Sequence, residues 1–251
     1  MIRQYYIKEP YHTSVLSGEA WVNELLNGHP ERIRTELGVH AHVFQQLIHE
    51  LYIMGYRGSR YVSLEEQLAI FLYVSVTGLT IRNTGERFQR ANATISTYFR
   101  RMLYAFAFPP FYTKYVKLSS LTDPPPTELK NNSKLWPYFK HCLGAIDGSH
   151  IHLASLPDSL RESCQNRKGF LSQNCLFACG FDLRFTYALT GWEGSASDAR
   201  VYESAVKSGD LQIPDNHYLL ADAGFPNRRE LLVPYRGKRY HLAEWGRARL
   251  R

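Results

Sequence analysis

Apolar residues in the first half of the chain recur every three to four positions, which is the spacing of the buried face of an amphipathic helix. One such run extends from Val43 to Leu51 and stops at Gly55, which predicts a helix that ends at a glycine cap. Ser63 and Glu66 have capping-box spacing ahead of a second apolar run, which Gly78 closes. The first half of the chain is therefore predicted to be helical.

Two further helices are predicted after Gly78, because Thr80 and Asn92 are residue types that cap helix N-termini. Helices joined by tight turns over about residues 63–107 are compatible with a helix-turn-helix unit, whose third helix enters the major groove of DNA. The polar residues that this helix would offer are Asn92, Thr94, Ser96, Thr97, Arg100 and Arg101. A small helical bundle with a solvated polar face explains the same pattern equally well.

A proline-rich segment interrupts the helical pattern. Residues 119–135 contain three consecutive prolines, which exclude a helix and stiffen the chain. The predicted organisation is a helical domain over residues 1–118, a linker over residues 119–135 and a second domain over residues 136–251.

Beyond this linker, apolar and polar residues alternate as they do in strands. Strands are predicted at Cys142–Ile146, Ile151–Ala154, Cys175–Phe181, Phe185–Leu189 and Tyr218–Ala221. A hairpin at 182–184 joins the third strand to the fourth, and a helix over 196–206 separates the fourth from the fifth. The second domain is therefore predicted to be a mixed sheet with a crossover helix, which makes the chain an α+β protein.

The amino-acid composition favours an anionic partner. The 251 residues include 30 Lys and Arg against 23 Asp and Glu, a net charge of +7, which fits a polyanion such as nucleic acid. No apolar run is long enough to span a bilayer, so a membrane is not expected as a partner. Four cysteines with neither metal-site nor disulfide-scaffold spacing are expected to be reduced and mostly buried.

Three aspartates of the second domain each stand where an apolar segment meets a glycine or small-residue turn. They are Asp147 in GAIDGSH, Asp198 in GWEGSASDARVY and Asp222 in YLLADAGFP. Carboxylates held on rigid elements are the ligands that hard divalent cations prefer. Two-metal phosphodiester chemistry needs several such carboxylates at one point.

Each aspartate also has an ordinary structural explanation. Asp147 followed by glycine is a hairpin-turn signal, and Ser195 with Asp198 fits a capping box. Asp222 can be a turn residue that ends a strand. The spacing alone leaves these alternatives open.

Other candidate residues have two explanations as well. His150 and His152 can ligate a transition metal or form a hydrogen-bonded structural pair. Arg167 and Lys168 can contact phosphate or water, and Trp192 can stack on a base or pack in the core.

Longer motifs resemble a known family. The segments are GAIDGSHI, RKGFLSQNCLFACGFDLRFTYALTGWEGSASDARVYES and YLLADAGFPNRRELLVPYRGKRYHLAEWG, preceded by YHTSVLSGEAWVNELLNGHPERI, EEQLAIFLYVS and ERFQRANATIS. In this order they resemble the PIF/Harbinger transposases and their domesticated nuclease relatives, over nearly the whole chain.

The resemblance implies a DDE-type, RNase H-like nuclease domain that follows a helical region. It implies cleavage and strand transfer of DNA with Mg²⁺ or Mn²⁺, in the nucleus, commonly beside a separate Myb-like DNA-binding protein. Asp147 and Asp222 match the first and second catalytic acids, and Asp198 matches a further metal-ligand position. Arg100, Arg101, Arg167, Lys168, Arg228 and Arg229 are the expected DNA contacts.

The third acid of the family is a glutamate on a later helix, and the sequence ends at Arg251 before such a helix. Glu244 occupies a different motif position. The expectation is therefore a nuclease domain that lacks its C-terminal helix or helices and is inactive or weak. The alternatives are a DNA-binding or protein-interaction module without catalysis, or a hydrolase of small phosphate esters.

Overall fold

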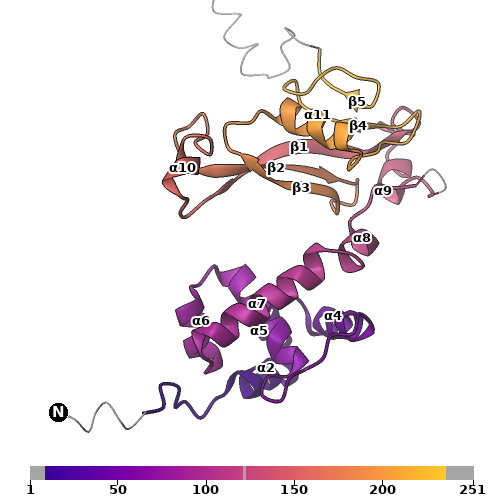
Figure 1. Cartoon of the computed structure of the whole chain (residues 1–251). Coiled ribbons are helices and arrows are strands. Elements are labelled where there is room, and N and C mark those ends of the chain that lie inside the picture. Colours follow the sequence, from indigo (N-terminus) through magenta and orange to yellow (C-terminus); the bar gives the residue numbers. More distant parts are fainter. Residues whose placement is uncertain (1–8, 121–122, 236–251) are drawn as a thin grey trace, which may run out of the picture. The chain divides into compact units, whose positions relative to one another are not determined.

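The computed structural model describes residues 9–120 and 123–235 (Figure 1). The chain divides into two compact units, Met1–Lys114 and Tyr115–Arg251. The division therefore falls ahead of the segment predicted as a linker. Part of that segment is packed: it contains α9 (Thr127–Lys130), in which Leu129 is fully buried.

The first unit is built from helices packed around α5. The described elements are α2 (Gly18–Asn27), α3 (Pro30–Leu37), α4 (Ala41–Ile53), α5 (Leu64–Thr77), α6 (Ile81–Phe88), α7 (Asn92–Ala107) and α8 (Phe111–Tyr115), the last of which spans the division. Helix α5 buries side chains around most of its circumference and contacts α2, α3, α4, α6 and α7. The helices predicted from the periodicity correspond to α4–α7.

Local capping signals set most of these boundaries. The Ser63 side chain accepts a hydrogen bond from the Glu66 N–H at 3.2 Å, and Gly78 ends α5 with a φ of +64°. Thr80 caps α6 as predicted. The prediction that Asn92 caps the next helix is wrong by one residue, since Ala91 is the cap and Asn92 is the first residue of α7.

The second unit contains one five-stranded sheet. Its strands are β1 (Cys142–His152), β2 (Ser172–Cys179), β3 (Phe185–Glu193), β4 (Tyr218–Leu220) and β5 (Leu231–Leu232), accompanied by α9, α10 (Asp158–Arg161) and α11 (Asp198–Ser208). The order is β3-β2-β1-β4-β5. Strands β1, β2 and β3 are antiparallel neighbours, whereas β4 runs parallel to β1 and β5 parallel to β4. The predicted mixed sheet is confirmed, and its topology is consistent with an RNase H-like domain.

One strand prediction is wrong. The two runs expected on either side of Asp147 and Gly148 form a single strand, β1, because Asp147 pairs with Phe177 and Gly148 with Leu176 of β2. The Asp-Gly dipeptide is therefore not a hairpin turn. The hairpin at 182–184 is confirmed, and the Asp182 carboxylate accepts a hydrogen bond from the Arg184 N–H across it.

Helix α11 covers one face of this sheet (Figure 1). Its residues Val201, Tyr202 and Ala205 pack with buried strand residues that include Ile146 and Leu176. This packing fixes the N-terminus of α11 next to β1 and β2. None of the helices in the described ranges is both long and apolar enough to cross a membrane.

Candidate active site

Asp147 lies on β1, and Asp222 follows the neighbouring parallel strand β4. Ala145 of β1 is in register with Leu220, the last residue of β4, and each aspartate comes two residues later in the sequence. Side chains at equal register in a parallel pair leave the sheet on the same face, and adjacent strands are about 4.8 Å apart. The two carboxylates are close enough for the charge of Asp222 to raise the pKa of Asp147, although they are distant in sequence.

Asp198 is brought to β1 by the start of α11. Ser197 caps this helix by accepting from the Arg200 N–H, and Asp198 is its first residue. The alternative explanation of Asp198, a capping box with Ser195, is therefore wrong. The Asp198 carboxylate lies against the backbone of Gly148, so that a Cβ placed on Gly148 would be 1.9 Å from Asp198 Oδ1.

The three carboxylates share one pattern of hydrogen bonding. Oδ1 of Asp147 accepts from the Gly148 N–H at 2.8 Å, Oδ1 of Asp222 from the Gly224 N–H at 2.8 Å, and Oδ1 of Asp198 from Asn174 Nδ2 at 2.8 Å. Within the described ranges, Oδ2 of each accepts no hydrogen bond, and none of the three forms an ion pair with Lys or Arg. Each carboxylate is thus held through one oxygen and presents the other.

Electrostatics also link the three groups. Partial burial raises the pKa of the Asp147 carboxyl, even though part of the side chain reaches solvent, and the hydrogen bond from Gly148 lowers it. The negative charges of Asp222 and Asp198 raise this pKa further. Carboxylates that repel one another and form no ion pair with a basic side chain are favourably placed to accept a cation.

A cavity of about 560 Å³ lies beside the carboxylates and is lined by Asp198, Asp222 and Gly148, together with the basic residues Arg167 and Lys168. Both basic side chains are exposed. They project from a turn that Asn166 organises, since its Oδ1 accepts hydrogen bonds from the Lys168 and Phe170 N–H groups. The cavity thus combines two acidic side chains with two exposed basic side chains.

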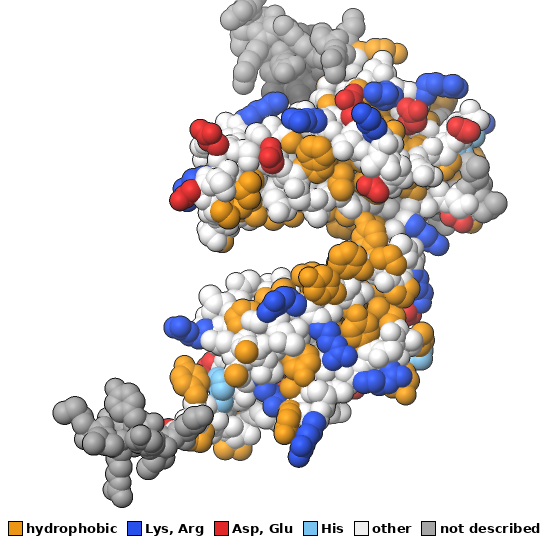
Figure 2. Space-filling view, in the orientation of Figure 1, with side chains coloured by type: hydrophobic (Ala, Val, Ile, Leu, Met, Phe, Trp, Pro, Cys, Tyr) orange, Lys and Arg blue, Asp and Glu red, His pale blue; other side chains and the backbone are white. Residues whose placement is uncertain are grey.

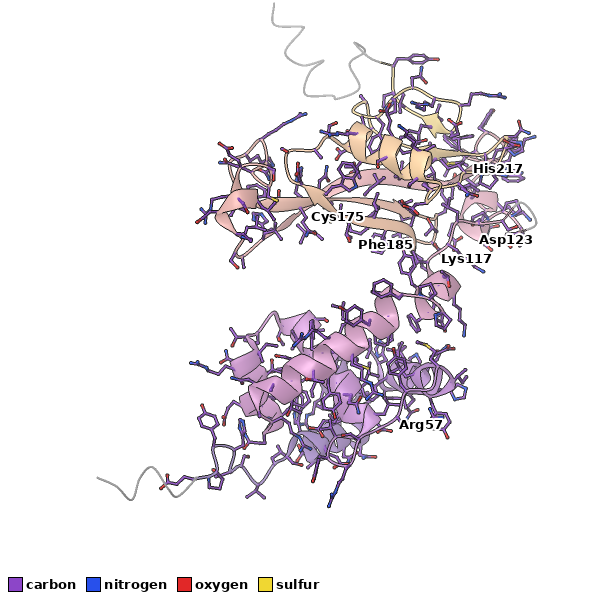
Figure 3. All side chains as sticks on the ribbon, in the orientation of Figure 1. Arg57, Lys117, Asp123, Cys175, Phe185 and His217 are labelled. Atoms are coloured by element: carbon purple, nitrogen blue, oxygen red, sulfur yellow. The ribbon has the colours of Figure 1, made fainter. Side chains whose placement is uncertain are left out.

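Arg228 and Arg229 lie elsewhere in the second unit. Arg228 pairs with Glu203 of α11 at 3.2 Å. Arg229 lines a separate cavity of about 490 Å³ near the start of β4, where Figure 3 labels His217. The structure does not bring these two arginines to the carboxylate cavity.

The first unit offers a limited basic surface on α7. Arg100 is exposed, whereas Arg101 donates to Gln67 Oε1 at 3.2 Å and its guanidinium lies over the Tyr56 ring. On the face seen in Figure 2, basic side chains of this unit are separated by apolar and uncharged surface. Of the two arginines of α7 that were expected to contact DNA, Arg101 therefore makes contacts within the first unit instead.

The two histidines of β1 have separate partners. His150 Nδ1 is 3.1 Å from Ser172 Oγ, and the His152 ring stacks on Phe170. They do not form the metal pair considered from the sequence. Trp192 packs against the core beneath α11. The four cysteines are free, and Cys179 is the one that is not buried.

A buried amide in this site was not predicted from the sequence. Asn174 of β2 is 1% exposed and donates to Asp198. An asparagine amid the apolar run of β2 is the signal that could have identified it, because buried polar side chains need hydrogen-bond partners.

The donor set fits a hard divalent cation, since it consists of carboxylate oxygens that form no ion pair with a described Lys or Arg. In the part of the chain that the structure describes, however, no three His, Cys, Asp or Glu side chains are close enough together to hold an ion as they stand. The ligand types at the site therefore fit a divalent metal ion, but the side chains are not close enough together to coordinate one in their present positions.

A five-stranded mixed sheet in this order, with aspartates on β1 and after β4, is consistent with an RNase H-like domain of the DDE type. Residues 146–249 match a family model described as DDE superfamily endonuclease. This match supports the resemblance seen in the sequence: the second unit is similar to DDE superfamily endonucleases. Residues 13–107 match a second family model, described as a domain of unknown function (DUF8040).

A curated relative is similar over most of this chain. Protein ALP1-like from Arabidopsis thaliana is 25% identical over 194 residues, which cover 70% of this chain and 46% of the relative. The chain therefore spans less than half the length of that protein. No solved structure matches the chain significantly.

Proposed function

We propose that the chain is a PIF/Harbinger-type protein whose second unit cleaves or joins DNA phosphodiesters with the help of a divalent metal ion. The observation that carries this proposal is the set of three neighbouring carboxylates, Asp147, Asp198 and Asp222, each held through one oxygen and lacking a described basic partner. The match to the DDE superfamily endonuclease family supports the reaction class.

Asp147 and Asp222 are the proposed catalytic ligands, and Asp198 the proposed additional ligand, for Mg²⁺ or Mn²⁺. Such an ion, when bound, activates an attacking oxygen and stabilises the leaving one. The residues of this chain orient the three carboxylates. Hydrogen bonds from Gly148, Gly224 and Asn174 fix one oxygen of each.

DNA is the proposed substrate, and the nucleus the proposed location. A Myb-like DNA-binding protein is the proposed partner, because the resemblance seen in the sequence implies one. Arg167 and Lys168 are the proposed phosphate contacts, since they are exposed on the rim of the carboxylate cavity. Cations at this place would hold the DNA backbone beside the metal ligands.

The proposal predicts that the full chain binds Mn²⁺ and nicks supercoiled plasmid only weakly in the presence of Mg²⁺ or Mn²⁺. Asp147→Asn and Asp222→Asn each remove one anionic ligand, so we expect Mn²⁺ affinity to fall by about tenfold or more and nicking to disappear. Titration calorimetry and agarose-gel analysis of the plasmid measure the two effects.

Asp158→Asn is the matched control, because Asp158 is a fully exposed aspartate of the same unit. It should bind Mn²⁺ and nick DNA as the unmodified chain does. Failure of the unmodified chain to bind Mn²⁺, or nicking that survives in Asp147→Asn, would contradict the proposal. Metal binding without nicking would favour the alternative of a DNA-binding module without catalysis.

A second prediction concerns the basic rim. Replacing Arg167 and Lys168 together with alanine should weaken DNA binding and reduce the slope of log K against log salt by about two, because each lost phosphate contact removes roughly one released counterion. Fluorescence anisotropy with a labelled duplex at several salt concentrations measures the slope.

Alanine at Arg184 and Lys207 is the control pair. Both are basic residues of the same unit, but they lie at the β2–β3 hairpin and at the end of α11. Equal slopes for the two double variants would show that net charge, and not the cavity rim, determines DNA affinity.

A further inference from the structure

Two residues without ionisable side chains lie next to the Asp198 carboxylate. Gly148 of β1 lies beneath the carboxylate, and Asn174 of β2 donates to one of its oxygens. Residues from three elements, β1, β2 and α11, therefore meet at this one side chain.

The amide of Asn174 is oriented unambiguously. Its Nδ2 is 2.8 Å from Asp198 Oδ1 and 3.0 Å from the Ala196 carbonyl oxygen. Both neighbours are acceptors, so a reversed amide would place its own oxygen against two other oxygens. The two hydrogen bonds connect β2 to the last residues before α11 and to the first residue of that helix.

The buried amide of Asn174 also has a destabilising feature. Asn174 is 1% exposed, and its Oδ1 has no hydrogen-bond partner among the described residues. A buried amide oxygen without a partner is destabilising by about 1–3 kcal/mol relative to a satisfied one. An apolar residue would avoid this cost, because Leu176 and Ala178 occupy the same buried face of β2. The donor at position 174 is therefore explained by its two acceptors, Asp198 Oδ1 and the Ala196 carbonyl oxygen.

Gly148 leaves room for the Asp198 carboxylate. A Cβ at this position would lie 1.9 Å from Oδ1 and 2.3 Å from Cγ of Asp198. The backbone of Gly148 needs no left-handed conformation, since it is not among the glycines with positive φ. Its lack of a side chain is thus required by the carboxylate and not by the strand.

We propose that Gly148 and Asn174 are positioning residues, which hold Asp198 beside Asp147 so that its second oxygen can bind the divalent cation. The inference rests on the proposed function. It explains why an acid at the first position of a helix lies against a neighbouring strand, whereas an acid that only favours the helix dipole would face solvent.

The test is a set of double-mutant cycles with Mn²⁺ as the probe. Gly148→Ala and Asn174→Leu should each lower Mn²⁺ affinity by about tenfold, as is typical when a residue that orients a metal ligand is changed. On an Asp198→Ala background neither change should lower affinity further, because both act through Asp198.

Water-proton relaxation provides a readout that a loss of stability would not imitate. If Asp198 is a ligand, displacing it admits water to the ion, so the relaxivity of bound Mn²⁺ should rise equally in Gly148→Ala, Asn174→Leu and Asp198→Ala. Gly148→Ala should also keep the thermal midpoint of the metal-free protein nearly unchanged, because only a short side chain must move. Asn227→Leu, at an exposed asparagine of the same unit, is the control.

The outcomes separate the two proposals. If the unmodified chain binds no Mn²⁺, the proposed function fails and this inference fails with it. If the chain binds Mn²⁺ and both variants bind it with unchanged affinity and relaxivity, the proposed function stands and the positioning role is wrong. Additive losses on the Asp198→Ala background would also overturn the positioning role.

Discussion

Gly144→Ala is expected to abolish the ordered sheet of the second unit. Gly144 has a φ of +145°, and a Cβ at this position would lie 1.9 Å from the carbonyl oxygen of Cys179 and 2.9 Å from its carbon. These are backbone atoms of the paired strand β2, so they cannot rotate away as a side chain can. We expect destabilisation of more than about 4 kcal/mol, at the upper end for single substitutions.

The position of Gly144 explains why this substitution should also remove the site. The pairing of β1 with β4 is irregular between Cys142 and Gly144 and then aligns Ala145 with Leu220. That alignment is what makes Asp147 and Asp222 neighbours. A β1 strand pushed away from β2 would lose it, so Mn²⁺ binding should be lost together with the fold.

Hydrogen exchange followed by mass spectrometry measures the effect on the second unit separately from the first. Amides of β1 and β2 should exchange at nearly the rate of an unfolded peptide in Gly144→Ala. Gly191→Ala is the control, since Gly191 also has positive φ, +92°, but no atom lies within 4 Å of the added Cβ. It should cost only about 1–2 kcal/mol of backbone strain. Protected β1 amides in Gly144→Ala would refute the prediction.

The parts of the fold that were predicted correctly depend on local signals. Ser63, Gly78 and Thr80 act on backbone groups within a few residues, so a short window of sequence contains the whole interaction. The hairpin at 182–184 is local in the same sense. Errors occurred where a distant partner decides the outcome.

Asp147 shows how a distant partner overrides a local signal. The Asp-Gly dipeptide favours a turn, yet eight consecutive residue pairs with β2 keep the strand extended through it. The three aspartates could be identified as candidates from their motifs. Their grouping could not, because it depends on the register of β1 with β4 and on the packing of α11 against the sheet.

Glu66 shows the same limit in the first unit. Its N–H completes the predicted cap with Ser63, but its carboxylate does not return to the Ser63 N–H as a capping box requires. It is instead fully buried and accepts two hydrogen bonds from Arg90, at 2.8 and 2.9 Å. The spacing of residues 63 and 66 contains no information about an arginine that follows α6.

Arg90→Ala should destabilise the first unit by about 3–5 kcal/mol, because it leaves the Glu66 carboxylate buried without its partner. The Glu66 side chain is 0% exposed and that of Arg90 is 24% exposed, so solvent cannot replace the lost guanidinium. The hydrogen bonds with Glu66 also raise the pKa of Arg90. Urea unfolding, followed by the fluorescence of Trp21 in the core of this unit, measures the loss.

Three variants show whether the buried charge is the cause. Arg32→Ala removes an exposed partner of Glu24 and should cost less than about 1 kcal/mol. Arg90→Lys keeps the positive charge but loses the bidentate hydrogen bonding to Glu66, so the loss of stability should be intermediate. The double variant E66M/R90M removes both charges and should recover most of the stability lost in Arg90→Ala. If Arg90→Ala costs no more than Arg32→Ala, the ion pair does not hold α5 to the end of α6, and the apolar core alone stabilises this unit.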